Sequence, residues 1–186
     1  NSSEILDDPQ KFGFRHINIS INRVSLNPIT SLKYIFSLSK ILKLENPDYV
    51  LLYTSKIVIF GSIASKIAKI KKVCSTITGL GYVFASNSLK ARALLILLHK
   101  LYKVALGFNS KVFFQNSDDR NYFLKNKLVD KHKSILINGS GVNINEFKPA
   151  AKLDKRYIFL MIARIIPEKG VYEFVNAARI VKEKYP

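Results

Sequence analysis

The sequence predicts an α/β fold in which helices pack on a mostly parallel sheet. Short β-type runs alternate with longer runs whose apolar residues recur at helical spacing, as in successive βα units. Of the 186 residues, 48% are hydrophobic and 23% are charged, which excludes a disordered or low-complexity chain. At roughly 100–200 residues per domain, this length suits one domain, or one domain with part of a second.

Before residue 80 the pattern predicts three strands and two helices. Asn27-Pro28 and Thr54-Ser55 are residue types that begin helices, and Asn46-Pro47-Asp48 is a stop and a turn. The strand after that turn is apolar at almost every position, as a strand buried on both faces requires. The predicted elements are a strand at 17–21, a helix from 27 to the turn, a strand at 49–53, a helix at about 56–70 and a strand at 73–78.

After residue 80 the alternation continues. Asn116 or Ser117 is expected to cap a short helix, with Asp118 and Asp119 in the first turn, where acidic side chains favour the positive end of the helix. The other elements are a helix at about 88–106 and strands at 111–115 and 132–137. Together these units imply a doubly wound sheet with helices on both faces and ligands at the carboxyl ends of its strands.

The periodicity is lost around residues 146–155, which we interpret as a linker. A second βα pattern follows, with a strand at 156–162 and a helix from about Lys169, so the predicted domains are 1–148 and 149–186. Asn1 is not a start methionine, and the last helical pattern stops at Tyr185-Pro186 without a following strand. We therefore expect a fragment whose first domain lacks its start and whose second is truncated.

Positive charge dominates the chain. Thirty Lys and Arg against thirteen Asp and Glu give a net charge of +17, which indicates a polyanionic partner such as nucleic acid, anionic lipid or a phosphorylated substrate. Residues 49–117 contain no Asp or Glu at all. The cations of this acid-free stretch are Lys56, Lys66, Lys69, Lys71, Lys72, Lys90, Arg92, Lys100, Lys103 and Lys111.

One predicted helix of the acid-free stretch is both basic and Leu-rich. Its cations Lys90, Arg92, Lys100 and Lys103 suit a membrane-facing surface, where Lys and Arg meet anionic lipid and apolar side chains enter the interface. The alternative is a helix packed on the sheet with a solvated basic edge. The longest aliphatic run, residues 93–98, is far shorter than the roughly 20 residues of a membrane span.

Two further stretches could bind a ligand. Gly79-Leu80-Gly81 follows a strand and would let a ligand approach the backbone closely, although an ordinary turn would look the same. Arg164 is expected at the carboxyl end of a strand, with Lys169 where the next helix begins, so two cations and a helix N-terminus would converge. This arrangement suits a diphosphate, whereas ordinary surface cations are the simpler interpretation.

The histidines and the cysteine predict no metal or nucleophilic site. His16, His99 and His132 are not paired at ligand spacing, so we assign them structural or solvated roles. Cys74 is the single cysteine and lies in an apolar run, which excludes a disulfide framework and indicates a core thiol in a reducing compartment.

The chain resembles a known enzyme family in four stretches that occur in order. These are residues 53–84, residues 113–119, residues 138–149 and residues 163–170, the last reading Ala163-Arg164-Ile-Ile-Pro-Glu168-Lys169-Gly170. They are similar to glycosyltransferase family 4, retaining enzymes of the GT-B fold, and in particular to the branch that adds a sugar to undecaprenyl-diphosphate-linked saccharides. The resemblance covers about residues 15–186.

The resemblance implies two Rossmann-like domains that face each other across a cleft. The first would hold the acceptor and touch the membrane, with Lys56, Thr78, Gly79 and Gly81 as possible acceptor-side residues. The second would bind the nucleotide sugar, with Arg164 and Lys169 on the donor diphosphate, so that neither a metal nor another cofactor is expected.

Three departures from the family pattern limit what the resemblance assigns. The family's paired glutamates would lie beyond Pro186, and its first glycine loop would precede Asn1, so no catalytic residue is assigned and the fragment by itself is expected to be inactive. Many relatives carry a histidine where this chain has Thr78-Gly79, so no catalytic histidine is transferred either.

The sequence thus predicts a peripheral membrane enzyme at the inner face of the bacterial cell membrane. It would transfer a hexosyl- or N-acetylhexosaminyl-type sugar from a nucleoside-diphosphate sugar to a polyprenyl-diphosphate-linked saccharide, in surface polysaccharide or glycan biosynthesis. The alternative is a basic α/β domain that binds nucleic acid without enzymatic activity. Against this alternative, the aromatic residues lie mostly within apolar runs, and no recognised nucleic-acid-binding motif is found.

Overall fold

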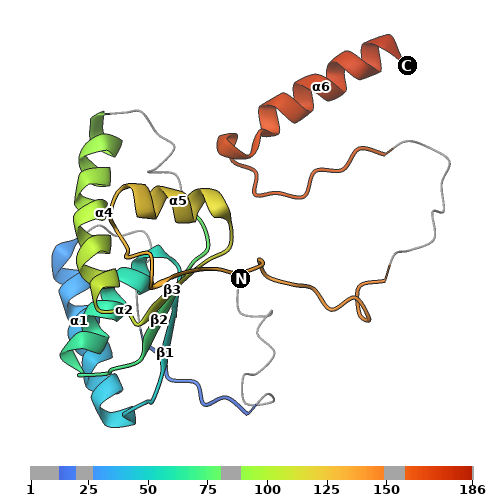
Figure 1. The fold of residues 1–186 in the computed structure, drawn as a ribbon. Helices are drawn as coiled ribbons and strands as arrows, with labels where there is room; N and C mark the ends of the chain where they lie inside the picture. Colours follow the sequence, from blue (N-terminus) through green and yellow to red (C-terminus); the bar gives the residue numbers. More distant parts are fainter. Residues whose placement is uncertain (1–12, 20–26, 81–88, 149–157, 186) are drawn as a thin grey trace. The chain divides into compact units, whose positions relative to one another are not determined.

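The computed structural model describes residues 13–19, 27–80, 89–148 and 158–185. The chain divides into two compact units, Asn1–Gly141 and Val142–Pro186, and each is described by itself. Among the described residues, the first unit holds a parallel sheet and most of the helices, and the second holds a short 3-10 helix and one α-helix (Figure 1). The domain boundary predicted between residues 148 and 149 stays a prediction.

The described residues of the first unit form a four-stranded parallel sheet. Its strands are β1 (Val50–Tyr53), β2 (Val73–Ile77), β3 (Lys111–Phe114) and β4 (Ser134–Leu136), and they lie in the order β1-β2-β3-β4. Val50 lies opposite Val73, and Val112 pairs with both Ser75 and Ser134. The predicted α/β class is therefore confirmed, and strands that are consecutive in the chain are also neighbours in the sheet.

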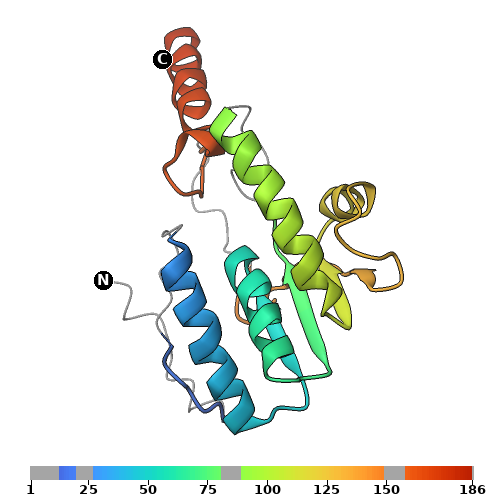
Figure 2. The ribbon, with the colours of Figure 1, turned by 90° about the vertical axis from the view of Figure 1, so that its left-hand side faces the viewer.

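The helices of this unit are α1 (Pro28–Glu45), α2 (Ser55–Ile67), α4 (Leu89–Gly107) and α5 (Ser117–Lys125). Figure 2 shows α1, α2 and α4 side by side in one layer. Right-handed crossovers between strands that follow one another in the same direction place every connecting helix on the same face of the sheet. The expectation of helices on both faces is thus wrong for the described residues.

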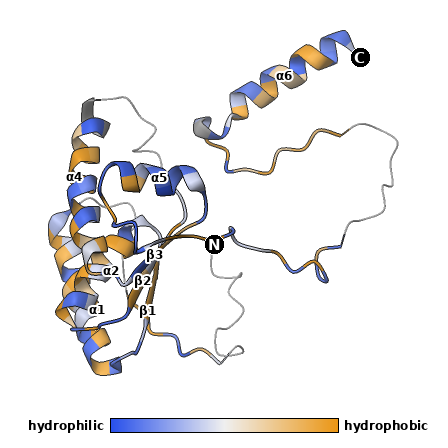
Figure 3. Ribbon diagram, in the orientation of Figure 1, coloured by the Kyte–Doolittle hydropathy of each residue, from blue (hydrophilic) through white to orange (hydrophobic). Residues whose placement is uncertain are grey.

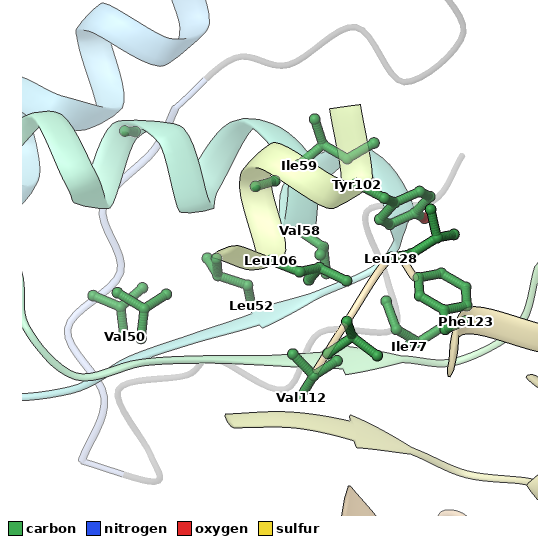
Figure 4. Close-up of a cluster of buried hydrophobic side chains, with 14 of the residues drawn as sticks. Val50, Leu52, Val58, Ile59, Ile77, Tyr102, Leu106, Val112, Phe123 and Leu128 are labelled. Carbon is green, nitrogen blue, oxygen red and sulfur yellow. The ribbon is translucent and has the colours of Figure 1, made fainter. Parts of the chain in front are cut away.

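The hydrophobic core lies between this helix layer and the sheet (Figure 4). Phe123 of α5 packs edge-on against Tyr102 of α4 and Phe114 of β3, with ring centroids 5.0 and 5.3 Å apart. Gly61 of α2 lies so close to β1 that an added Cβ would come within 2.7 Å of Leu52 Cδ2. A glycine in this helix therefore lets α2 approach the sheet closely.

A buried polar cluster crosses the core. Asn109, just before β3, donates from Nδ2 to Ser62 Oγ of α2 at 2.8 Å and to the Ala105 carbonyl of α4 at 2.9 Å. Its Oδ1 accepts from Ser75 Oγ of β2 at 2.8 Å. All three side chains are fully buried or nearly so. One amide thus ties two helices and a strand together, and its own hydrogen-bonding atoms are satisfied.

Two predicted helix starts are confirmed, and a third is only partly right. Asn116 Oδ1 accepts from the Asp119 amide at 2.8 Å, and Asn27 Oδ1 accepts from the Ile29 amide at 2.9 Å. α2 begins at Ser55 with Thr54 as the N-cap residue, but the Thr54 side chain makes no capping hydrogen bond. Thr54 therefore occupies the predicted N-cap position but does not form the capping hydrogen bond.

Several strand predictions differ from the structure. Residues 17–19 and 158–162 belong to no strand, while 20–21 and 156–157 lie outside the described residues. β1 is buried on one face only, since Leu51 and Tyr53 are 61% and 51% exposed. Cys74 is half-buried rather than part of the core, because Val73 and Ser75 take the core-facing positions of β2. An apolar run forms a strand only where a neighbouring strand pairs with it. In the described sheet, no strand pairs with residues 17–19 or 158–162.

We expect Asn109→Ala to lower the free energy of unfolding by about 2–3 kcal/mol, because it leaves the buried Ser75 and Ser62 hydroxyls without their amide partner. Urea unfolding followed by circular dichroism measures the change. The control is Asn126→Ala, which removes an exposed amide that donates to the Tyr122 carbonyl and should cost less than about 1 kcal/mol. Equal losses in the two variants would contradict the role of the buried cluster.

Candidate functional site

The candidate site lies at the carboxyl edge of the sheet. Three strands run there into polar segments: β1 into Thr54 and Ser55, β2 into Thr78 and Gly79, and β3 into Gln115. Because the strands are parallel, these segments emerge along one edge. The topology thus brings the predicted acceptor-side residues Lys56, Thr78 and Gly79 to that edge, whereas Gly81 lies outside the described residues.

Thr54 has a strained backbone. Its φ of 69° and ψ of 145° lie in a region that is almost reserved for glycine, and a β-branched side chain makes this conformation more costly still. The strain occurs where the chain turns sharply from β1 into α2. Nothing in the sequence indicated it, because threonine at the end of a strand is ordinary.

The edge is electrically asymmetric. α2 and α4 have no acidic residue in the first turn, and Lys56 is the second residue of α2 and half-buried. The partial positive charge of a helix N-terminus and the Lys56 ammonium therefore have the same sign at the β1 end. α5 carries Asp118 and Asp119 in its first turn, so the β3 end is acidic. An anionic group would thus be favoured near β1 and β2.

Gly79 leaves open space beside the backbone. Its φ of 149° is a conformation that L side chains rarely adopt, and a Cβ built on it would meet no atom of the described residues within 4 Å. The neighbouring Thr78 is exposed. The two residues therefore form an accessible end of β2, and Leu80 after them packs against the core.

Gln115 and Ser140 connect the ends of β3 and β4, and sequence reasoning gave them no role. Gln115 Nε2 donates to Ser140 Oγ at 3.2 Å, and the Ile137 amide donates to the Phe114 carbonyl at 2.9 Å. The segment after β4 is thereby held against the end of β3. The signal that could have found this pair is the polar residue directly after β3 and the polar run of residues 138–140 shortly after β4.

The predicted membrane-facing residues lie on α4. Arg92, Lys100 and Lys103 are exposed, and nothing is described of the Lys90 side chain. The same outer side of the helix exposes the apolar side chains of Ile96, Leu97 and Val104. Figure 3 shows this mixture as alternating hydrophilic and hydrophobic bands along α4. None of the described helices is long and apolar enough to cross a membrane.

His99, on the inner side of α4, contacts α5. Its Nε2 lies 2.9 Å from the Tyr122 hydroxyl, and the two rings meet edge-on with centroids 5.7 Å apart. Burial lowers the pKa of His99 and raises that of Tyr122. In the described residues, no group of three His, Cys, Asp or Glu side chains is arranged to hold a metal ion.

The second unit carries the two predicted diphosphate ligands. The chain turns after Arg164, passes through the 3-10 helix η2 (Pro167–Lys169) and enters α6 (Val171–Lys184). Arg164 and Lys169 are both exposed, and Gly170, with φ of 73°, is the N-cap residue of α6 and gives it no side-chain cap. Lys169 therefore lies directly before a helix start, as predicted, with Glu173 in the first turn.

Comparison with known proteins identifies the family. Residues 2–116, more than half of the chain, match the model of the family described as glycosyl transferase 4-like. The chain belongs to the glycosyl transferase 4-like family. The matched region ends at Asn116, so it includes the first three strands of the sheet and the Thr54 and Thr78 segments.

Two curated relatives are bacterial transferases. The chain is 32% identical over 185 residues to the N,N'-diacetylbacillosaminyl-diphospho-undecaprenol alpha-1,3-N-acetylgalactosaminyltransferase of Campylobacter jejuni, covering 92% of the chain and 49% of that relative. It is 28% identical over 170 residues to the UDP-Gal:alpha-D-GlcNAc-diphosphoundecaprenol alpha-1,3-galactosyltransferase of Escherichia coli, covering 86% of the chain and 43% of that relative. The chain thus spans about half the length of the curated relatives it matches.

We expect Thr54→Gly to raise the free energy of unfolding by about 1 kcal/mol, because glycine relieves the backbone strain at a smaller entropic cost. The control is Thr54→Ser, which keeps a Cβ and a hydroxyl, removes only the branching methyl group and should give a smaller gain than glycine. Thermal and urea unfolding measure both variants. Destabilisation by the glycine relative to the serine would contradict the strain at this position.

Proposed function

We propose that this chain acts in the transfer of a sugar from a nucleoside-diphosphate sugar to a saccharide linked to a polyprenyl diphosphate. The observation that carries this proposal is its similarity, over most of its length, to two transferases whose names both specify a diphospho-undecaprenol acceptor. Membership of the glycosyl transferase 4-like family supports the reaction class.

The acceptor would bind at the carboxyl edge of the first unit. A diphosphate-linked saccharide presents phosphate oxygens and many hydroxyl groups. The β1 and β2 ends offer Lys56, the uncapped start of α2, the Thr78 hydroxyl and the open backbone at Gly79. The cationic groups suit the diphosphate, and the polar groups suit sugar hydroxyls.

The donor diphosphate would bind Arg164 and Lys169 of the second unit. Neither side chain forms an ion pair within the described residues, and Lys169 lies directly before a helix N-terminus. When the bond between sugar and phosphate breaks, negative charge grows on the leaving diphosphate. Two cations placed there would stabilise that charge without a metal or another cofactor. The retaining stereochemistry is part of the proposal by family resemblance.

The outer side of α4 would face the inner leaflet of the cell membrane. Its exposed cations Arg92, Lys100 and Lys103 would meet anionic headgroups, and the exposed Ile96 and Leu97 would enter the interface. A peripheral enzyme attached in this way would reach an acceptor whose lipid chain stays in the bilayer. By itself the 186-residue chain, about half the length of its relatives, is expected to give no turnover.

We expect Arg164→Ala or Lys169→Ala to lower the turnover of the intact protein by roughly 10²–10³-fold, because each removes a charge-assisted hydrogen bond that strengthens in the transition state. Stability should change little, since both side chains are exposed. Steady-state kinetics with a nucleoside-diphosphate sugar and a polyprenyl-diphosphate acceptor measure the effect. Lys184→Ala, on the last turn of α6, is the control, and retention of most activity in both test variants would refute the diphosphate site.

We expect the chain to cosediment with phosphatidylglycerol vesicles more than with phosphatidylcholine vesicles, and less as salt increases. The double variant Lys100→Glu with Lys103→Glu should reduce this binding by at least roughly tenfold, since each lysine near an anionic surface contributes about 1 kcal/mol. The control is the double variant Lys125→Glu with Lys127→Glu, which makes the same charge change at exposed positions at the end of α5 and should bind vesicles more strongly than the α4 variant. Equal binding to both lipids, or no binding at low salt, would remove the membrane proposal for α4.

A further inference from the structure

α1 has a second apolar side that points away from the protein. Tyr34, Ile35 and Leu42 are buried on the inner side, as a helix packed on a neighbour requires. Ile29, Leu32 and Phe36 are 62%, 53% and 57% exposed. Their spacing of three and four residues places them in one stripe along the outer side of the helix. We call these three residues the α1 stripe.

The exposed side of α1 is also cationic. Lys33, Lys40 and Lys43 are exposed on the same helix, and the helix contains no acidic residue before Glu45, its last position. Large apolar side chains beside lysines, without acids, are the composition of helices that lie in an anionic membrane interface. There the apolar groups enter the acyl boundary, and the lysine stems extend their ammonium groups towards lipid phosphates.

The α1 stripe lies near the candidate site. Only residues 46–49 separate Glu45 from β1, so the end of α1 lies at the amino edge of the sheet, and the helix start lies towards the carboxyl edge. Figure 2 shows that α1 and α2 begin at the same end of the helix layer, and α2 begins where β1 ends. The stripe occupies the first half of α1. It therefore lies towards the edge that carries Lys56 and Gly79.

We propose that the α1 stripe inserts into the interface of an anionic lipid bilayer and holds the carboxyl edge of the sheet at the membrane surface. The three lysines of α1 supply the charge that such a surface attracts. The part of this inference that concerns the acceptor rests on the proposed function. The diphosphate of a membrane-anchored acceptor lies at the same depth as the lipid headgroups, so an edge held at the membrane surface could reach it. The binding of the stripe to lipid does not depend on catalysis.

A tryptophan reporter tests the insertion directly, since the chain contains no tryptophan. In Phe36→Trp, phosphatidylglycerol vesicles should shift the emission to shorter wavelength, and lipids brominated on the acyl chain should quench it. Tyr49→Trp is the matched control: position 49 is 60% exposed but lies just before β1, at the amino edge of the sheet, away from the proposed membrane side. Its emission should change little. Equal shifts and quenching at the two positions, or none at position 36, would overturn the proposal.

A second variant separates the stripe from α4. Ile29→Ser, Leu32→Ser and Phe36→Ser together remove only exposed apolar groups, so the fold should survive, as circular dichroism would show. Binding to phosphatidylglycerol vesicles should fall at least roughly tenfold, while Leu44→Ser, at the exposed far end of α1, should bind as the parent does. Unchanged vesicle binding of the triple variant overturns the proposal, as does a stripe that instead mediates self-association, detected by analytical ultracentrifugation without lipid.

The vesicle experiments contain neither donor nor acceptor, so their outcome is independent of the transfer reaction. The triple variant could lose vesicle binding while the intact protein transfers no sugar to any polyprenyl-diphosphate saccharide. That result would refute the proposed function and leave the lipid-binding stripe in place. If the intact protein transfers sugar but the triple variant binds vesicles as the parent does, only the proposal for the α1 stripe is refuted.

Discussion

The arrangement of the first unit depends on the buried amide of Asn109. Hydrogen bonds from this one side chain reach α2, α4 and β2, and each partner lies in a part of the core from which water is excluded. A shift of α2 along the sheet would break the hydrogen bond from Asn109 Nδ2 to Ser62 Oγ and leave a buried N–H without its acceptor, at a cost of about 1–3 kcal/mol. The cluster therefore fixes the height of α2, and with it the position of Thr54 and Lys56 at the carboxyl edge.

A consequence of the strand order is that the two faces of the sheet differ. One face is covered by a continuous helix layer, whose outer surface combines lysines with exposed apolar residues on both α1 and α4. The other face presents Leu51 and Tyr53. In our proposals, the binding of anions at the edge and the contact with lipid on the helix layer thus belong to different parts of one compact unit.

The sequence was most informative where local chemistry decides the structure. Asn116 with Asp118 and Asp119 identified the start of α5, and the turn at Asn46-Pro47-Asp48 identified the end of α1. It was least informative where burial depends on distant partners: the alternation at 17–19 and the apolar run at 158–162 did not form strands. Leu32 and Phe36 are apolar residues of the same helix as the buried Ile35 but are exposed, and apolar spacing alone does not separate the two sides of α1. The strain at Thr54 had no sequence signal, since it arises from the geometry of the turn.

The sequential order of the strands also bears on how the unit acquires its structure. In the described sheet each strand pairs with the strand made just before it, so that no strand has to wait for a later segment to be inserted beside it. Contacts between consecutive βα units close comparatively short loops, and the entropy of loop closure is correspondingly modest. A chain emerging from the ribosome could add one unit at a time, each new helix covering the strand that precedes it, with Asn109 locking the central helices once α4 is complete.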